Sequence, residues 1–182
     1  MGRKLKVTEM GRMDVEAFKQ SQKIPLIVVL DNVRSMYNVG SVFRTSDAYR
    51  VSRIVLCGIT GCPPHPEIHK TALGAEDSVD WTYCQDTLEA VAELKRQGVH
   101  VYAIEQAEGS IDLRQWSMNN EQLTSPISIV LGNEVKGVQQ SVVDLCDACI
   151  ELPQYGTKHS LNVATAAGIV IWELFKQLHT EF

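Results

Sequence analysis

Three groups of polar residues stand next to apolar runs, and their side chains are of the kinds that bind anions and move protons. In chain order they are Asn38 and Arg44, Asn133 and Glu134, and His159, Ser160 and Asn162. The first two groups follow runs typical of buried strands, and the third opens the last apolar stretch. Ligands of open parallel sheets bind beyond the carboxyl ends of the strands, so we expect all three groups there. Taken singly, Asn38, Ser160 and Glu134 are equally well explained as helix caps and turn residues.

Arg44 is the least expected of these residues, because it follows Val42 and Phe43 in a segment with the pattern of a buried helix. A buried arginine requires an anionic partner or an anionic ligand. We therefore predict that Arg44 faces such a group and does not serve as a core residue.

Phosphate-binding loops are poorly supported. The segment 132–137, Gly-Asn-Glu-Val-Lys-Gly, has the glycine spacing of a Walker A loop, but Val138 and Gln139 stand where lysine and serine or threonine are required. No G-x-G-x-x-G segment follows any predicted strand. A nucleotide-binding enzyme of flavodoxin-like or Rossmann form is therefore an alternative that lacks its usual phosphate site.

Two sets of residues have the side chains of metal ligands: Cys57, Cys62, His65 and His69, and the C-x-x-C pair Cys146 and Cys149. Three prolines at 63, 64 and 66 already explain a rigid loop around the first set. The second set reads as a helix end that runs into a strand, where small apolar cysteines are usual. We therefore expect no metal.

An alternating framework must position the polar groups. Short apolar segments predict strands at 26–30, 53–57, 78–83, 99–105, 127–132 and 148–153. Helical patterns lie at 39–49, 86–98 and 138–146, the second with Asp86 or Thr87 as N-cap. This order predicts an α/β fold with a mostly parallel sheet and helices on both faces. The stretch 58–77 shows no clear periodicity and is expected to be a functional loop.

The two ends of the chain differ from this framework. Residues 1–24 are charged and only weakly helical, so we expect an N-terminal basic arm outside the core, followed by one domain at 25–182. The last helix, expected from Ser160 onward, is apolar nearly all round in its middle. It is either enclosed within one chain or in contact with a second subunit, and we favour the second subunit.

The composition is that of an ordinary soluble globular protein of 182 residues, with 45% hydrophobic and 21% charged residues. A formal net charge of −5 argues against nucleic-acid binding through bulk charge and leaves only local basic surfaces. Five cysteines, the absence of a long apolar run and a polar N-terminus favour a cytoplasmic protein without a membrane span.

Three segments together resemble the SpoU/TrmH family of the SPOUT RNA methyltransferases. They are 31–48 with its Asn-x-Gly-x-x-x-Arg-Thr core, 129–138 and 150–174, in the order and at the spacing of the family. The resemblance covers about residues 26–178. It implies methylation of a ribose 2′-hydroxyl in tRNA or rRNA with S-adenosylmethionine as cofactor. It also implies a C-terminal trefoil knot, which periodicity could not show and which is rare among folds, and a homodimer packed through the last helix. The basic arm and the second subunit would then supply the RNA contacts.

The family's functional positions carry over onto residues of these segments. Cofactor-binding positions are similar to Gly132, Leu152, Leu161 and Ile104, and catalytic and RNA-binding positions are similar to Arg44, Asn38, Glu134, Ser160 and Asn162. An RNA-binding module without catalysis is the other alternative, and the complete polar set argues against it.

The role of the arginine is open to two interpretations. A 2′-hydroxyl is a poor nucleophile until its proton has an acceptor, and the family's usual proposal makes the arginine, here Arg44, the general base. Because a guanidinium group is almost never neutral at pH 7, we prefer another hypothesis. Arg44, held by Asn38 and Glu134, binds an RNA phosphate and stabilises the developing alkoxide. The proton leaves through phosphate, water or Ser160.

Overall fold

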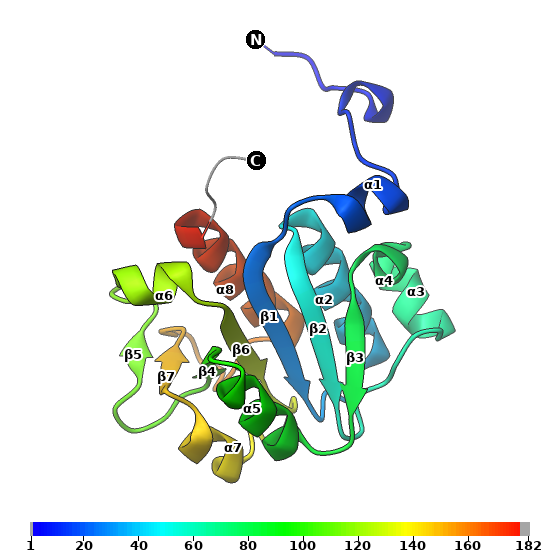
Figure 1. Ribbon diagram of the computed structural model, residues 1–182. Coiled ribbons are helices and arrows are strands. Elements are labelled where there is room, and N and C mark those ends of the chain that lie inside the picture. Colours follow the sequence, from blue (N-terminus) through cyan, green and yellow to red (C-terminus); the bar gives the residue numbers. More distant parts are fainter. Residues whose placement is uncertain (1, 179–182) are drawn as a thin grey trace.

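The computed structural model describes residues 2–178, which form one seven-stranded sheet with helices around it (Figure 1). The strand order is β3-β2-β1-β6-β4-β7-β5, and all paired strands are parallel. The strands are β1 (Ile24–Asp31), β2 (Val51–Cys57), β3 (Trp81–Cys84), β4 (His100–Ile104), β5 (Ile111–Asp112), β6 (Ile127–Leu131) and β7 (Ala148–Glu151). The predicted parallel α/β architecture is confirmed.

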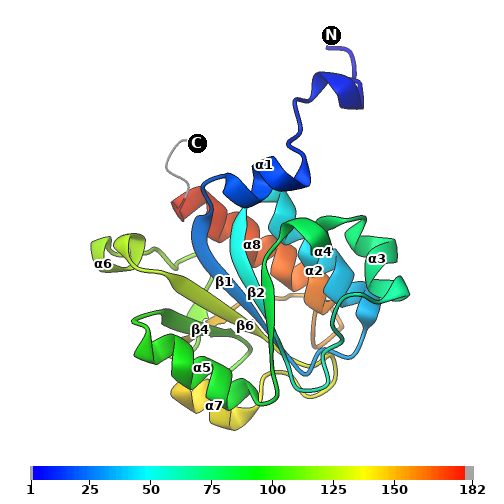
Figure 2. The ribbon, with the colours of Figure 1, turned by 45° about the vertical axis from the view of Figure 1, so that its right-hand side comes forward.

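Helices cover both faces of the sheet (Figures 1 and 2). One face carries α2 (Met36–Ala48) and α8 (Val163–Leu178), with α3 (Pro66–Ala72) and α4 (Ala75–Ser78) packed on α2, and the other carries α5 (Thr87–Arg96) and α7 (Gln140–Leu145). The remaining helices are η1 (Val7–Glu9), α1 (Val15–Gln20) and α6 (Asn120–Thr124). No helix within residues 2–178 is long and apolar enough to cross a membrane.

The alternating side chains of β1 divide the core into two layers. Leu26, Val28 and Leu30 belong to the cluster on the α2 and α8 side, whereas Ile27 and Val29 belong to the cluster on the α5 and α7 side. All five side chains are buried. A central parallel strand that is covered on both faces requires such a continuous apolar run, and the strand predicted at 26–30 is confirmed within β1.

Two predicted boundaries between residues 58 and 84 are wrong. The stretch 58–77 contains α3 and α4 and is not irregular throughout, and the strand expected at 78–83 begins only at Trp81. Ser78 ends α4, and its hydroxyl group donates to Asp47 Oδ1 of α2 at 2.6 Å, which holds this residue in the helix layer. β5 and α6 were not predicted, because they are too short to display a period.

α2 and α3 lie close together because residue 40 is glycine. A Cβ atom at Gly40 would stand 2.2 Å from Ile68 O and 2.2 Å from Thr71 Oγ1. Real Cβ atoms do not approach so closely, so a side chain at this position would push the two helices apart. Gly40 thus lets the backbone of α3 reach α2.

The segment before β1 contributes one side chain to the core. Residues 2–6 and 8–17 are exposed, but Phe18 of α1 is buried in the same cluster as α2 and α8. Lys23 Nζ lies 4.4 Å from the centre of the Phe18 ring. The prediction that residues 1–24 lie outside the core is therefore wrong at Phe18, and also at Ile24, which begins β1 and is buried.

α8 is only partly covered by its own chain. Val170, Ile171 and Leu174 are buried against the sheet, whereas Ile169 is 42% exposed and Trp172 is 47% exposed. The two exposed side chains lie three residues apart and therefore share one face of the helix. The first of the two predicted alternatives, in which α8 is enclosed within one chain, is therefore wrong for this face of the helix.

Candidate active site

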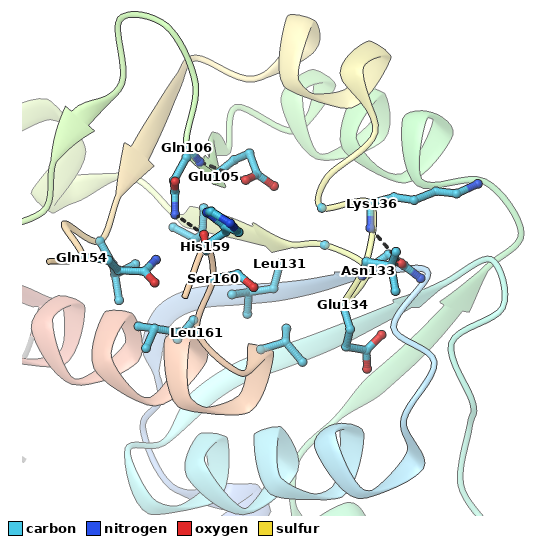
Figure 3. Close-up of a pocket in the computed structure, with 17 residues that line it drawn as sticks. Glu105, Gln106, Leu131, Asn133, Glu134, Lys136, Gln154, His159, Ser160 and Leu161 are labelled. Atoms are coloured by element: carbon cyan, nitrogen blue, oxygen red, sulfur yellow. Dashed lines mark hydrogen bonds between the residues drawn. The ribbon is translucent and has the colours of Figure 1, made fainter. Parts of the chain in front are cut away.

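A pocket of about 320 Å³ lies at the carboxyl ends of β4, β6 and β7 (Figure 3). Its walls come from the loop after β4, the loop after β6 and the segment that leads from β7 to α8. The volume lies at the lower end of the range for small-molecule sites. Its place is the one where open parallel sheets bind ligands, as the sequence predicted.

The four residues predicted to bind a cofactor all line this pocket. Ile104 and Leu152 are buried, and Leu161 is 40% exposed. A Cβ atom at Gly132 would stand 2.1 Å from Val138 N, so only glycine permits the loop after β6 to turn back this closely. The pocket thus combines apolar side chains with a tight backbone turn.

Hydrogen bonds join the three loops of the pocket. Glu105 Oε2 accepts from Val138 N at 3.0 Å, and Glu105 Oε1 accepts from Gln106 N at 2.9 Å. The side chain of Gln106 donates from Nε2 to His159 O at 2.9 Å (Figure 3). The loop after β4 therefore holds both of the other loops in place.

Sequence reasoning missed four polar residues that line the pocket: Glu105, Gln106, Lys136 and Gln154. A signal for Glu105 was present, since this carboxylate is the last residue of the strand predicted at 99–105. The other three stand in loops, where no local pattern marks them as different from ordinary solvent-facing residues.

Asn38, Glu134 and Asn162, one from each of the three motifs, form a continuous hydrogen-bonded network. Asn162 Nδ2 donates to Asn38 Oδ1, and Asn38 Nδ2 donates to Glu134 Oε1, both at 3.0 Å. The backbone N–H groups of Arg34 and Ser35 donate to the two carboxylate oxygens of Glu134 at 3.0 Å. Burial raises the pKa of Glu134, but the hydrogen bonds outweigh it and hold that pKa below its usual value. The predicted convergence of these three residues is confirmed.

The network also includes helix caps. Asn162 Oδ1 accepts from two N–H groups in the first turn of α8, at 2.9 and 3.2 Å. The helix therefore begins at Val163, and the prediction that it begins at Ser160 is wrong. Ser160 lies in the preceding loop and lines the pocket. The side chain of Ser35 caps α2, so Asn38 is not the cap.

Arg44 lies apart from the network, which contradicts the prediction that Asn38 and Glu134 hold it. Its side chain is exposed, and within residues 2–178 it makes no hydrogen bond or ion pair. The expectation of a buried arginine with an anionic partner is therefore wrong. Arg44 lines a separate hollow of about 540 Å³, together with Lys70 of α3 and Gly168 of α8.

The histidines and the buried cysteine considered as metal ligands have other roles. The Nδ1 atom of His65 accepts from Glu67 N and caps α3, and His69 Nδ1 lies 2.5 Å from Glu76 Oε1. Burial raises the pKa of Cys57 to about 12, so its thiol stays protonated. In the part of the chain that the structure describes, no three His, Cys, Asp or Glu side chains are grouped to hold a metal ion.

The model of the SpoU rRNA Methylase family matches residues 25–172, which is most of the chain and includes the pocket and the network. The chain belongs to the SpoU rRNA methylase family. The resemblance seen in the three sequence motifs is thereby confirmed.

Relatives within this family act on RNA. The 23S rRNA (guanosine-2′-O-)-methyltransferase RlmB of Nitrosomonas europaea is 31% identical over 152 residues, which cover 84% of this chain and 56% of the relative. The AdoMet-bound rRNA methyltransferase of Sinorhizobium meliloti superimposes with a TM-score of 0.77 at 31% identity, over 87% of this chain and 59% of that one. A TrmH/SpoU tRNA modifying enzyme of A. aeolicus superimposes with a TM-score of 0.76 at 29% identity, over 90% and 79%.

This SpoU-family chain is shorter than most of these relatives. It spans between 56% and 66% of the length of the curated relatives that it matches first. The shared part contains the whole sheet, since the family match runs from β1 into α8.

Proposed function

We propose that this chain is an S-adenosylmethionine-dependent RNA methyltransferase that transfers a methyl group to a ribose 2′-hydroxyl of tRNA or rRNA. One observation carries the proposal: the network of Asn162, Asn38 and Glu134 adjoins a ligand-sized pocket, and Glu134 belongs to both. The names of the relatives support it, because one methylates a guanosine 2′-oxygen in 23S rRNA and another modifies tRNA.

The residues of the pocket fit S-adenosylmethionine. Ile104, Leu152 and Leu161 offer apolar surfaces for an adenine ring, and Gly132 leaves no side chain beside them. Glu105 and Glu134 provide negative charge near a cofactor whose amino and sulfonium groups are positive. When bound, the cofactor supplies the methyl group. The solved relative from S. meliloti is described as AdoMet bound.

The chain's own residues prepare the site before the reaction. Two backbone N–H groups fix the carboxylate of Glu134, which orients Asn38, and Asn38 in turn orients Asn162. A preorganised polar surface of this kind positions a ribose without reorganisation during the reaction. The 2′-oxygen gains a methyl group and loses its proton, which leaves through an RNA phosphate, water or Ser160. Arg44 stabilises the negative charge that develops on that oxygen.

Arg44 does not line the pocket of its own chain, and we propose that it acts at the site of a second copy. Its hollow is bordered by Gly168 of α8, and the same helix exposes Ile169 and Trp172. Burial of two large apolar side chains favours association. A homodimer through this face of α8 brings Arg44 to the contact between the two copies, where RNA can reach residues of both.

We further propose that residues 152–162 form the threaded segment of a C-terminal trefoil knot. β7 lies near one edge of the sheet, but α8, which follows it, packs on α2 and β1. The connecting segment therefore crosses the ends of β4 and β6, where His159 O accepts from Gln106.

We also propose that residues 1–24 form a basic arm and that residues 25–182 form the methyltransferase domain. A cytoplasmic location is part of the same proposal.

Incubation of the purified protein with total RNA and S-adenosylmethionine labelled in its methyl group tests the activity. We expect labelled RNA, and after alkaline hydrolysis we expect labelled dinucleotides, because a 2′-O-methyl group blocks cleavage of the neighbouring phosphodiester bond. A Gly132→Leu variant, whose side chain collides with the backbone of Gly137 and Val138 and displaces the loop that lines the pocket, is the control. Unlabelled RNA from the folded wild-type protein would refute methyl transfer, and label in alkali-released mononucleotides alone would place the methyl group on a base.

A further inference from the structure

We propose that a groove between the N-terminal segment and α2 binds the phosphate backbone of the substrate RNA. The groove has a volume of about 710 Å³ and lies between residues 10–18 on one side and α2 with the α3 to α4 turn on the other. Arg12, Arg44 and Arg50 line it. The inference rests on the proposed function, because it identifies the surface that leads the RNA to Arg44.

The local charge of the groove differs from that of the whole chain. The chain carries a formal net charge of −5, whereas residues 1–14 contain four basic and two acidic residues. Two carboxylates line the groove, and both accept internal hydrogen bonds: Asp14 from Ala17 N at 2.8 Å and Asp47 from Ser78 Oγ at 2.6 Å. Arg12 is exposed and has no hydrogen bond or ion pair within residues 2–178. Its guanidinium group is therefore available to an external anion.

The groove continues toward the candidate active site. Arg44 and Ala48 line both this groove and the hollow that contains Lys70, so the two depressions adjoin along α2. Lys70 Nζ lies 5.9 Å from the centre of the Tyr37 ring, at the other end of α2 and next in sequence to Asn38. A row of cations alongside α2, of which only Arg44 belongs to that helix, matches the regularly spaced phosphates of a nucleic-acid strand.

RNA is the occupant that these features favour. Contacts to phosphate position a nucleic acid without reading its sequence, which suits a groove whose cationic side chains are three arginines. Exposed apolar side chains of Met10, Met13 and Leu73 also line the groove and can contact ribose. Only the end of the groove at Arg44 and Ala48 adjoins the hollow beside α8, so a homodimer through α8 leaves open the remainder, between residues 10–18 and the α3 to α4 turn.

Salt-dependent RNA binding tests the groove. The probes are fluorescein-labelled unfractionated tRNA and fluorescein-labelled 23S rRNA fragments, titrated separately with wild type, Arg12→Gln and Arg50→Gln. The slope of log K against log salt is negative, and each lost phosphate contact reduces its magnitude by about 1. We expect this reduction in at least one RNA pool. Arg96→Gln, the same change in charge on α5 across the sheet, should keep the wild-type slope. Slopes that do not differ from this control in either pool would overturn the proposal.

Methyl transfer by the same four proteins separates this inference from the proposed function. We expect Arg12→Gln to raise the KM for RNA several-fold and to leave kcat unchanged, since Arg12 positions RNA and does not touch the reacting atoms. If wild type is active and the groove variants bind and react like Arg96→Gln, the groove does not bind RNA, and the proposed methyltransferase function stands. If the groove variants change the salt dependence of RNA binding but wild type transfers no methyl group, RNA binding in the groove is supported and the methyltransferase function is refuted.

An Arg12→Glu variant tests the other possible occupants. Light scattering reports whether the reversed charge changes the oligomeric state. A change in self-association without any change in RNA affinity identifies the groove as a protein contact and overturns its assignment to RNA. Weaker RNA binding at unchanged mass supports the assignment.

Discussion

At the scale of single residues, Glu134 connects the pocket to the amide network. Its two oxygens accept from the backbone of Arg34 and Ser35 and from Asn38, while the residue itself lines the pocket. All of these donors prefer the ionised carboxylate, which explains why its pKa is lowered in spite of burial. The orientation of Asn38 therefore depends on the charge of Glu134.

The Glu134→Gln variant should lower the free energy of unfolding by about 1 kcal/mol at pH 7, since an amide cannot accept at both positions and the site is partly solvated. The folded-state pKa lies below the unfolded value of about 4.3, so the ionised form stabilises the fold above that pH. The difference between variant and wild type should shrink below the unfolded pKa and disappear as the pH falls through the lowered folded-state pKa. Urea unfolding at several pH values measures it.

Glu108→Gln is the matched control for this prediction, because Glu108 is exposed in a loop outside the network. It should leave the unfolding free energy unchanged at every pH. An equal effect of both substitutions at pH 7 would show that the network does not depend on the carboxylate.

Arg44→Lys separates the two interpretations of the arginine. We expect methyl transfer to fall by about 100-fold or more at every pH between about 6 and 9, because an ammonium group lacks the planar fork that contacts phosphate and alkoxide together. Initial rates across this range measure the effect. Nearly full activity with an optimum moved to lower pH would instead favour Arg44 as general base.

At the scale of secondary structure, the pocket depends on how closely the loop after β6 returns on itself. Gly132→Ala places a Cβ atom 2.1 Å from Val138 N, so the backbone must move. Overpacking of this kind costs about 1–3 kcal/mol, and we expect S-adenosylmethionine to bind about 10-fold or more weakly by calorimetry. Gly156→Ala has no atom within 4 Å of its new Cβ and should bind like wild type.

Strands and helices with a clear period could be predicted, and the others could not. The run 26–30 reads as a strand because β1 is buried on both faces, and Asp86 marks the start of α5 because its side chain accepts from Leu88 N at 2.7 Å. β5 has two residues and leaves no pattern. α8 begins later than its apolar run indicates, because Asn162 caps it and Ser160 remains in the loop.

The part of the candidate site that lies at the carboxyl ends of the strands could be predicted. Asn38 and Glu134 follow strands and do meet, because the carboxyl ends of parallel strands share one edge of the sheet. The surroundings of Arg44 could not be predicted, since its local pattern does not reveal that its face of α2 is open to solvent. Lys136 and Gln154 become pocket residues only through the return of distant loops.

At the scale of the whole molecule, the proposed dimer makes the exposed face of α8 a requirement for activity. Trp172→Glu places a charge on this apolar face, and we expect a dimeric wild type and a monomeric variant by light scattering. Methyl transfer should fall with the loss of the dimer, because Arg44 no longer reaches a second site. Leu88→Glu, at a half-exposed position of α5 on the other side of the sheet, is the control.

Two results would contradict the dimer prediction. A wild-type protein that is monomeric and active would show that one chain holds a complete site. A Trp172→Glu protein that stays dimeric would place the contact elsewhere.

The most direct test of the central claim is the identity of the methylated nucleoside. Total RNA is incubated with the protein and S-adenosylmethionine, separated into tRNA and rRNA, digested to nucleosides and measured by mass spectrometry. We predict a new 2′-O-methylnucleoside in one of the two fractions with wild type and none with Asn162→Ala, which breaks the network that the three motifs form. A methylated base, or RNA left unchanged by the folded wild-type protein, would contradict the account.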